Sequence, residues 1–236
     1  MERLNKFLAQ SGVASRRGAD ELIVQGVVKV NGQVVDKPGK TINPEKDVVV
    51  CNGQVIKPIT KFVYILFNKP KGCITTCKDE LGRKTIFDYI KQDLPGIVPV
   101  GRLDYETEGL LILTNDGNLA HSLTHPSHEV PKTYQVKVEG EVKEHELAQL
   151  RKGVVIDGEK TKKCKVKLID FEDNISKLEI TITEGKNRQV RKMFEAIGKE
   201  VFFLRRIAIA DLRLGGLSRG GYRYLNDFEV EYLKRL

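Results

Sequence analysis

The chain has 236 residues, of which 40% are hydrophobic, so it is long enough to bury a packed core in one large domain or in two smaller ones. No apolar run approaches the ~20 residues of a membrane span, and the N-terminus lacks a signal-peptide core, which argues against membrane and secreted proteins and predicts a cytosolic one. Forty Lys and Arg against 32 Asp and Glu give a net charge of +8, which favours a polyanionic partner.

Residues 1–58 predict a small separate α/β module that begins with two helices. Leu4, Phe7 and Leu8 share one face of the first helix, and Ser15 is a suitable cap for the second. Two Asn-Gly dipeptides then mark tight turns, which predicts hairpins around residues 27–35 and after a strand over 47–50.

Four basic residues crowd the first helix and the start of the second, namely Arg3, Lys6, Arg16 and Arg17. Positive charge at a helix N-terminus is relieved when an anion such as phosphate binds there, although a solvated helix face explains the same pattern. The stretch RLNKFLAQSGVASRRGADELIVQGVVKVNG resembles an S4-type RNA-binding domain. That resemblance implies that the four basic residues contact the backbone of structured RNA.

Residues 59–236 predict a second domain, which follows a short proline-broken linker at 58–61. Its pattern indicates an α+β fold on a long, mainly antiparallel sheet. The expected strands span 62–67, 99–103, 110–114, 133–138, 163–169, 177–183 and 200–210, and the expected helices span 118–123, 141–150 and 188–197.

The stretch PVGRLDYETEGLLILTNDG, residues 99–117, is the main candidate for a site. Two strand-like runs flank a loop in which Asp104, Glu106 and Glu108 follow Arg102. A carboxylate beside a guanidinium at the end of a strand contributes little to a hydrophobic core but suits a catalytic site. Asp104 is therefore the candidate catalytic residue. A solvated acidic turn explains the same pattern, and the spacing does not match a calcium loop of the EF-hand type.

Three further residues gain meaning only in combination. Tyr134 starts a strand in PKTYQV, Arg191 lies in the first turns of a helix in EGKNRQVRKM, and Leu204 precedes two arginines in FFLRRIAI. Taken singly, tyrosine and leucine at such positions belong to a core more often than to a site.

Together these motifs resemble the pseudouridine synthases of the RsuA/RluB type, which modify ribosomal RNA and carry an S4-like domain in front. GRLDYETEGLLILTNDG matches the catalytic motif, FNKPKG the strand and loop before it, KTY the tyrosine motif and TEGKNRQVRKM the arginine motif. The resemblance covers both domains. It implies the pseudouridine synthase fold and the isomerisation of a flipped uridine in ribosomal RNA, with no cofactor and no metal.

By this resemblance Asp104 is the catalytic carboxylate, Tyr134 packs on the target base, Arg191 pairs with Asp104, and Leu204 walls the other side. We also expect Arg102 to fill the gap left by the flipped base or to hold its phosphate.

Four further basic residues are expected to line the channel as phosphate contacts, namely Lys69, Lys71, Arg188 and Lys192.

The segment 75–90, TTCKDELGRKTIFDYI, is more similar to the corresponding segment of enzymes that act on large-subunit (23S) ribosomal RNA, with small-subunit (16S) RNA as the alternative.

Two other functions stay open: a non-enzymatic S4-type RNA-binding protein, and a hydrolase that pairs Asp104 with Glu106 or Glu108. We expect a monomer that acts on ribosomal RNA or an assembly intermediate, without a membrane partner. A zinc site is an alternative for four residues, although their spacing matches no common structural pattern, namely Cys73, Cys77, His121 and His125.

Overall fold

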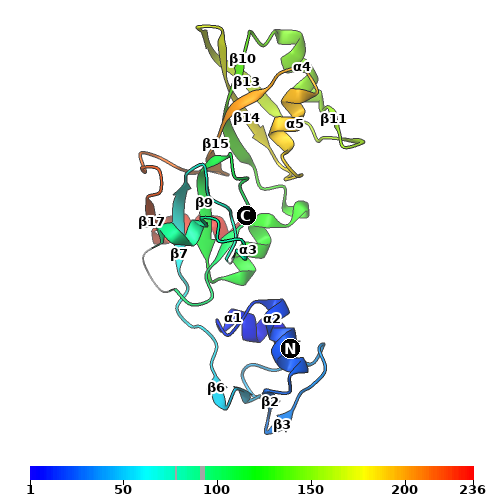
Figure 1. Cartoon of the computed structure of the whole chain (residues 1–236), viewed down its shortest axis with the longest axis vertical. Helices are drawn as coiled ribbons and strands as arrows, with labels where there is room; N and C mark the ends of the chain where they lie inside the picture. Colours follow the sequence, from blue (N-terminus) through cyan, green and yellow to red (C-terminus); the bar gives the residue numbers. More distant parts are fainter. Residues whose placement is uncertain (78, 91–93) are drawn as a thin grey trace. The chain divides into compact units, whose positions relative to one another are not determined.

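The computed structural model describes residues 1–77, 79–90 and 94–236 (Figure 1). Lys78, which belongs to the segment 75–90 that favoured large-subunit RNA, lies outside the described residues. The described chain forms two compact units, one built mainly from Met1–Tyr64 and the other from most of the chain after Ile65. None of the helices within these ranges is long and apolar enough to cross a bilayer.

The first unit packs two helices on small antiparallel sheets, as the sequence predicted. Its core contains Leu4, Phe7 and Leu8 from the first helix, together with Ala19 and Ile23 from the second. The elements are β1 (Glu2–Arg3), α1 (Leu4–Gln10), α2 (Arg16–Val24), β2 (Val28–Val30), β3 (Gln33–Val34), β4 (Thr41–Ile42), β5 (Val49–Cys51) and β6 (Gln54–Ile56).

Local side-chain chemistry explains the helix start and the turns of this unit. The Ser15 hydroxyl accepts the N–H of Gly18 at 3.0 Å, which confirms it as the cap of α2. Asn31 and Asn52 both adopt a left-handed backbone conformation, with φ of 51° and 49°, and each is followed by glycine in the hairpins β2–β3 and β5–β6.

The second unit is built on a large mixed sheet, which confirms the predicted α+β class. Within the described residues the sheet has nine strands, with the main order β13-β14-β10-β15-β9-β7-β17, while β16 pairs with β15 and β8 pairs with β9. The strands are β7 (Tyr64–Lys69), β8 (Val98–Val100), β9 (Glu108–Thr114), β10 (Lys132–Glu139), β13 (Lys165–Glu172), β14 (Ile175–Ile182), β15 (Val201–Ile209), β16 (Leu212–Arg213) and β17 (Tyr222–Tyr224).

Helices and a small hairpin surround this sheet. Helix α4 packs against β13, and α5 packs against β15 (Figure 1). The additional elements are η1 (Ile86–Tyr89), α3 (Gly117–Thr124), η2 (Pro126–His128), α4 (Glu144–Lys152), β11 (Val155–Ile156), β12 (Glu159–Lys160), α5 (Gln189–Glu195) and α6 (Asp227–Lys234). The hairpin β11–β12, strand β17 and helix α6 were not predicted.

Two predicted boundaries were wrong near the candidate site. Strand β8 ends at Val100 because Gly101 turns the chain with a φ of +75°, so Asp104 lies in a loop rather than at a strand end. Helix α5 begins at Gln189 because Arg188 adopts a left-handed conformation with a φ of 50°. Both corrections concern backbone conformations that residue type alone does not specify.

A close approach between β9 and β15 joins two parts of the sheet. These strands pair in parallel, with Glu108 opposite Arg205 and Gly109 opposite Arg206. A Cβ atom at Gly109 would lie 2.2 Å from the carbonyl oxygen of Arg206, and Gly109 has a φ of +110°. Only glycine therefore allows the two backbones to meet here.

Candidate active site

A pocket of about 370 Å³ opens beside this parallel junction. It is lined by the loop after β8, by the first residues of β10, by one face of β15 and by the loop that precedes α5. Five of the residues predicted from the sequence line it together, namely Arg102, Asp104, Tyr134, Arg188 and Leu204. The other four predicted pocket residues, Lys69, Lys71, Arg191 and Lys192, are not part of the lining.

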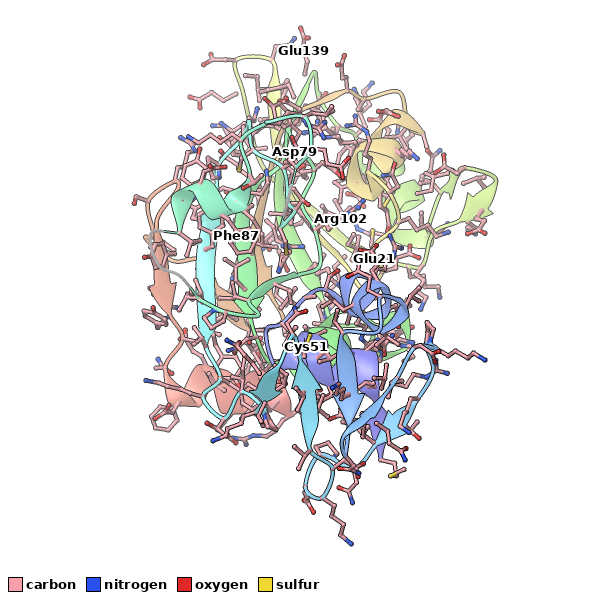
Figure 2. All side chains as sticks on the ribbon, turned by 60° about the horizontal axis from the view of Figure 1, so that its bottom comes forward. Glu21, Cys51, Asp79, Phe87, Arg102 and Glu139 are labelled. Atoms are coloured by element: carbon pink, nitrogen blue, oxygen red, sulfur yellow. The ribbon has the colours of Figure 1, made fainter. Side chains whose placement is uncertain are left out.

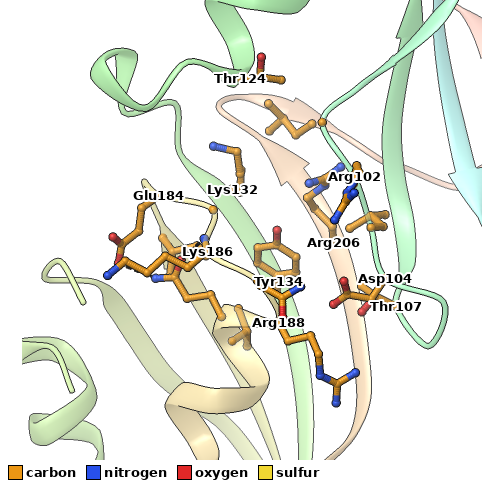
Figure 3. Close-up of a pocket in the computed structure, with 18 of the residues that line it drawn as sticks. Arg102, Asp104, Thr107, Thr124, Lys132, Tyr134, Glu184, Lys186, Arg188 and Arg206 are labelled. Atoms are coloured by element: carbon orange, nitrogen blue, oxygen red, sulfur yellow. Dashed lines mark hydrogen bonds between the residues drawn. The ribbon is translucent and has the colours of Figure 1, made fainter. Parts of the chain in front are cut away.

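Asp104 is the acidic residue of its loop that faces the pocket. Its side chain is half-buried and extends toward the ring of Tyr134 (Figure 3). Glu106 is exposed and does not line the pocket, while Glu108 is 3% exposed and accepts hydrogen bonds from Arg219 at 2.8 and 3.0 Å. The loop therefore offers one carboxylate for chemistry, not the pair that the hydrolase hypothesis needs.

A second carboxylate, that of Glu184, lines the pocket from the other side, but its Oε1 is already engaged. It accepts the backbone N–H of Lys162 at 2.9 Å and the side-chain amide of Gln189 at 2.5 Å. These contacts make Glu184 part of the loop's scaffold.

Lys69 was wrongly predicted to be a phosphate contact. Its side chain is fully buried, and its Nζ donates to the carbonyl oxygens of Pro70, Asp104 and Thr107 at 3.1, 3.0 and 2.9 Å. Burial lowers its pKa, whereas the carboxylates of Asp104 and its neighbours act in the opposite direction. Because three carbonyls occupy the three donors of the ammonium, Lys69 anchors the Asp104 loop instead of binding RNA.

Arg191 supports the same loop from a buried position. Its Nη1 donates to the carbonyl of Val201 at 2.6 Å and its Nη2 to that of Glu106 at 3.2 Å. Among the described residues, no ion pair within 4.0 Å joins Arg191 to Asp104, so the direct pairing expected from the sequence is corrected to a contact with the loop backbone. Burial and the charge of Arg188 lower the pKa of Arg191, and the carboxylate of Asp104 acts in the opposite direction.

Tyr134 and Leu204 lie on strands β10 and β15, which pair in antiparallel fashion. Both are buried, at 8% and 4% exposure, and both line the pocket. Tyr134 lies directly opposite Arg206, and Leu204 is two residues before Arg206, so strand alternation places all three side chains on the pocket face.

Other predicted basic residues are distributed around the pocket. Arg102 is exposed on the loop between β8 and β9 (Figure 2), and Arg188 is exposed at the start of α5. Lys71 is exposed and reaches the carbonyl of Phe202 at 3.4 Å. Lys192 forms an ion pair with Asp157 at 2.5 Å. Arg102 and Arg188 are thus the predicted phosphate contacts that reach the pocket.

The basic residues of the first unit lie where the sequence predicted. Arg16 and Arg17 are exposed in the first turn of α2, and Arg3 is exposed at the start of α1, whereas Lys6 is half-buried and lies 3.8 Å from Glu2. Neither helix has an acidic residue in its first turn. The helix N-termini therefore present uncompensated positive potential to solvent.

Arg206 and Lys132 line the pocket but were not predicted from the sequence. The signal for Arg206 was present, because residues two apart on a strand share a face and Leu204 was already assigned to the site. Lys132 lies two residues before Tyr134 on the same strand by the same rule. With Arg102, Lys186 and Arg188, these residues give the pocket five lysine or arginine side chains (Figure 3).

His121 and His125 have their ring centroids 5.0 Å apart, but the residues proposed for zinc do not form a metal site. Across residues 1–77, 79–90 and 94–236, no group of three His, Cys, Asp or Glu side chains has a geometry that could hold a metal ion. Cys73 is buried and Cys77 is exposed, both as free thiols.

Comparison with known proteins places both units in recognised families. A model described as RNA pseudouridylate synthase matches residues 63–196, and a model described as S4 domain matches residues 2–49. A Bacillus subtilis protein named ribosomal large subunit pseudouridine synthase B is 46% identical, over 100% of this chain and 97% of its own. An uncharacterized RNA pseudouridine synthase of Aquifex aeolicus is 44% identical, over 98% and 93%. A crystal structure of a pseudouridylate synthase, 34% identical, superposes with a TM-score of 0.72 over 99% of this chain and 100% of that one.

Proposed function

The chain belongs to the RNA pseudouridylate synthase family, and we propose that it converts a uridine of large-subunit (23S) ribosomal RNA to pseudouridine. The observation that carries this proposal is the pocket in which the carboxylate of Asp104 faces Tyr134 amid basic side chains. The name of the Bacillus subtilis relative supports the choice of the large subunit. A matched S4 domain supports structured RNA as the substrate.

The reaction is an isomerisation that one carboxylate can perform. The bond between ribose C1′ and uracil N1 breaks, the uracil turns, and C5 bonds to C1′ while C5 loses a proton and N1 gains one. Asp104 acts either by bonding to C1′, in a bond that breaks when C5 attacks, or by taking the proton from C2′ and returning it once C5 has bonded to C1′. No water enters the reaction, which is why the second carboxyl of a hydrolytic glycosidase has no task here.

We propose that Tyr134, Leu204 and the loop anchors Lys69 and Arg191 supply the geometry. The target base must leave its helix to reach Asp104, which costs a few kcal/mol of unstacking. Stacking on the buried ring of Tyr134 offsets part of that cost, and Leu204 closes the other side. Arg191 and Lys69 hold the loop backbone at Glu106 and Asp104.

The exposed cations at the mouth of the pocket fit the RNA backbone. We propose that Arg102 and Arg188 hold phosphates next to the flipped nucleotide, with Lys71 and Lys192 farther along the bound strand. We further propose that residues 1–58 form the RNA-binding domain and residues 59–236 the catalytic domain. In the first of these, Arg3, Lys6, Arg16 and Arg17 are the proposed phosphate contacts.

Mapping pseudouridine in ribosomal RNA by carbodiimide treatment and primer extension tests this function. We expect a stop in large-subunit RNA from cells with the wild-type protein and none from cells that carry the Asp104→Asn variant. A lost stop in small-subunit RNA would favour the 16S alternative. Unchanged stops in both RNAs would favour a non-enzymatic RNA-binding protein, and release of free uracil would favour the hydrolase.

Replacing Tyr134 tests base stacking in the pocket. We expect Tyr134→Ala to weaken transition-state binding by about 1–3 kcal/mol, which is roughly a 5- to 150-fold loss in kcat/KM. Tyr134→Phe keeps the ring and should stay within about threefold of the wild type, because stacking needs the π-face and not the hydroxyl. Equal losses in the two variants would assign the role to the hydroxyl and contradict stacking.

Salt dependence tests the RNA contacts of the first unit. We expect the Arg16→Gln/Arg17→Gln double variant to bind RNA more weakly and to reduce the slope of log K against log salt by about 1.5, since each phosphate contact contributes roughly 0.7 to 0.9. Lys29→Gln serves as the control, because Lys29 is exposed on β2 between two buried valines and points away from the core. An unchanged slope in the double variant would argue against these contacts.

A further inference from the structure

Arg206 is a buried cation for which the steps above provide no role. Its side chain is 3% exposed, and its Nε donates to the carbonyl of Leu110 at 2.7 Å. Its Nη2 is buried and has no hydrogen-bond partner in the part of the chain that the structure describes. A buried donor without a partner costs about 1–3 kcal/mol, and this one belongs to a residue that lines the pocket.

The surroundings of Arg206 call for an acceptor that carries negative charge. Lys132 lines the same pocket, and the charge of Arg206 contributes, after burial, to lowering the pKa of Lys132. Arg102 approaches from the loop above (Figure 3). Among the described residues, two carboxylates line the pocket. That of Glu184 accepts hydrogen bonds from Lys162 and Gln189, so the carboxylate of Asp104 is the one available to a ligand. Five lysine or arginine side chains and these two carboxylates line the pocket, which leaves an excess of positive charge for a ligand.

The burial of Arg206 within the pocket indicates which part of a bound nucleotide it contacts. Phosphates follow the RNA strand along the protein surface, where Arg102 and Arg188 are exposed. Arg206 instead lies on the pocket wall directly across the strand pair from Tyr134, at the level of the ring on which the base is proposed to stack. A cation beside a stacking aromatic faces the edge of the base.

We propose that the guanidinium of Arg206 donates a hydrogen bond to a carbonyl oxygen of the target uracil and stabilises the negative charge that the ring carries during the reaction. This inference rests on the proposed pseudouridine synthase function. When the C1′–N1 bond breaks, its electron pair stays on the uracil and spreads onto the carbonyl oxygens. The other half of the bond, at C1′, is satisfied by Asp104 as nucleophile or by loss of the C2′ proton. Arg206 acts on the leaving group in both routes.

The fixed position of the donor makes it effective. The hydrogen bond to Leu110 orients the guanidinium before substrate arrives, so little reorganisation is needed when charge develops. The interaction is stronger for the detached uracil anion than for neutral uridine, so it lowers the barrier more than it tightens ground-state binding.

The test compares uridine RNA with 5-fluorouridine RNA under single-turnover conditions, and the rate measured on both is the loss of the N1-linked nucleoside, because a 5-fluoro ring has no C5 proton to release. Fluorine at C5 lowers the pKa of uracil and makes it a better leaving group that needs less help. We expect Arg206→Gln to slow the conversion of uridine by about 100-fold. On 5-fluorouridine the loss should be smaller by at least about threefold, as expected for a leaving-group effect. Arg206→Lys keeps the positive charge but lacks the planar guanidinium with its several N–H donors. Its rate on uridine RNA should lie between those of Arg206→Gln and the wild type.

The ratio of the two substrate rates protects the test against misfolding, because both rates are measured on the same preparation and the folded fraction cancels. Arg205→Gln is the matched control: Arg205 is the neighbouring residue on β15, pairs with Gln135 and does not line the pocket. It should leave both rates within about twofold of the wild type, as expected for a substitution outside the site.

The possible outcomes separate this inference from the proposed function. If the wild-type protein forms no pseudouridine, the proposed function fails. If the wild type is active and Arg206→Gln matches it, the inference about Arg206 is wrong. If Arg206→Gln slows both substrates equally while the Kd for RNA rises, the contact is to a phosphate, and the inference is also wrong.

Discussion

Asp104→Asn is expected to lower the rate of pseudouridine formation by about 10⁴-fold or more, while the affinity for RNA stays near that of the wild type. Asparagine keeps the size of the side chain but can neither bond to C1′ nor take the proton from C2′. Because the loop is held through its backbone by Lys69 and Arg191, the substitution should leave the pocket intact. Release of tritium from uridine labelled at C5 measures the rate, and filter binding measures the affinity.

Glu106→Gln is the matched control for this prediction. Glu106 belongs to the same loop, but its side chain is exposed and does not line the pocket. We expect this variant to keep activity within about threefold of the wild type, as for an ordinary surface substitution. An active Asp104→Asn protein would remove the central claim about the site, and an inactive Glu106→Gln protein would revive a mechanism with two carboxylates.

Lys69→Met is expected to lower the free energy of unfolding by about 3 kcal/mol and to reduce activity as well. The substitution keeps a similar buried volume but leaves the carbonyls of Pro70, Asp104 and Thr107 without their donor. Removing a buried charge recovers part of its desolvation cost, which is why the loss is smaller than three charged hydrogen bonds would suggest. Urea unfolding measures stability, and the tritium assay on folded protein measures the effect on the Asp104 loop.

Lys71→Met supplies the comparison two residues along the chain. Lys71 is exposed, and its hydrogen bond to the carbonyl of Phe202 is long, at 3.4 Å. We expect its free energy of unfolding to change by no more than about 0.5 kcal/mol. Lys69→Met protein that is as stable as Lys71→Met, and equally active at low salt, would show that Lys69 does not anchor the loop.

The observed roles of Lys69 and Arg191 show which features of the site could not be predicted from the sequence. A lysine in a loop with Pro and Gly is normally a surface residue, so Lys69 was assigned to phosphate. Its burial depends on the Asp104 loop folding over it, 35 residues later in the chain. Arg191 was placed near Asp104 by resemblance, yet its partners are carbonyls of Glu106 and Val201, which no pattern of residue types specifies.

The sequence by itself determined the local structure and the family of this protein. Hairpin turns at Asn31 and Asn52 and the cap at Ser15 depend on neighbouring residues, and the motifs around Asp104, Tyr134 and Arg191 identified the chemistry. Only the tertiary structure decided which side chains meet in the pocket. The parallel contact of β9 with β15 at Gly109 sets the position of Arg206. These strands are distant in the sequence, so the conformational preferences of neighbouring residues do not determine which donors and acceptors meet.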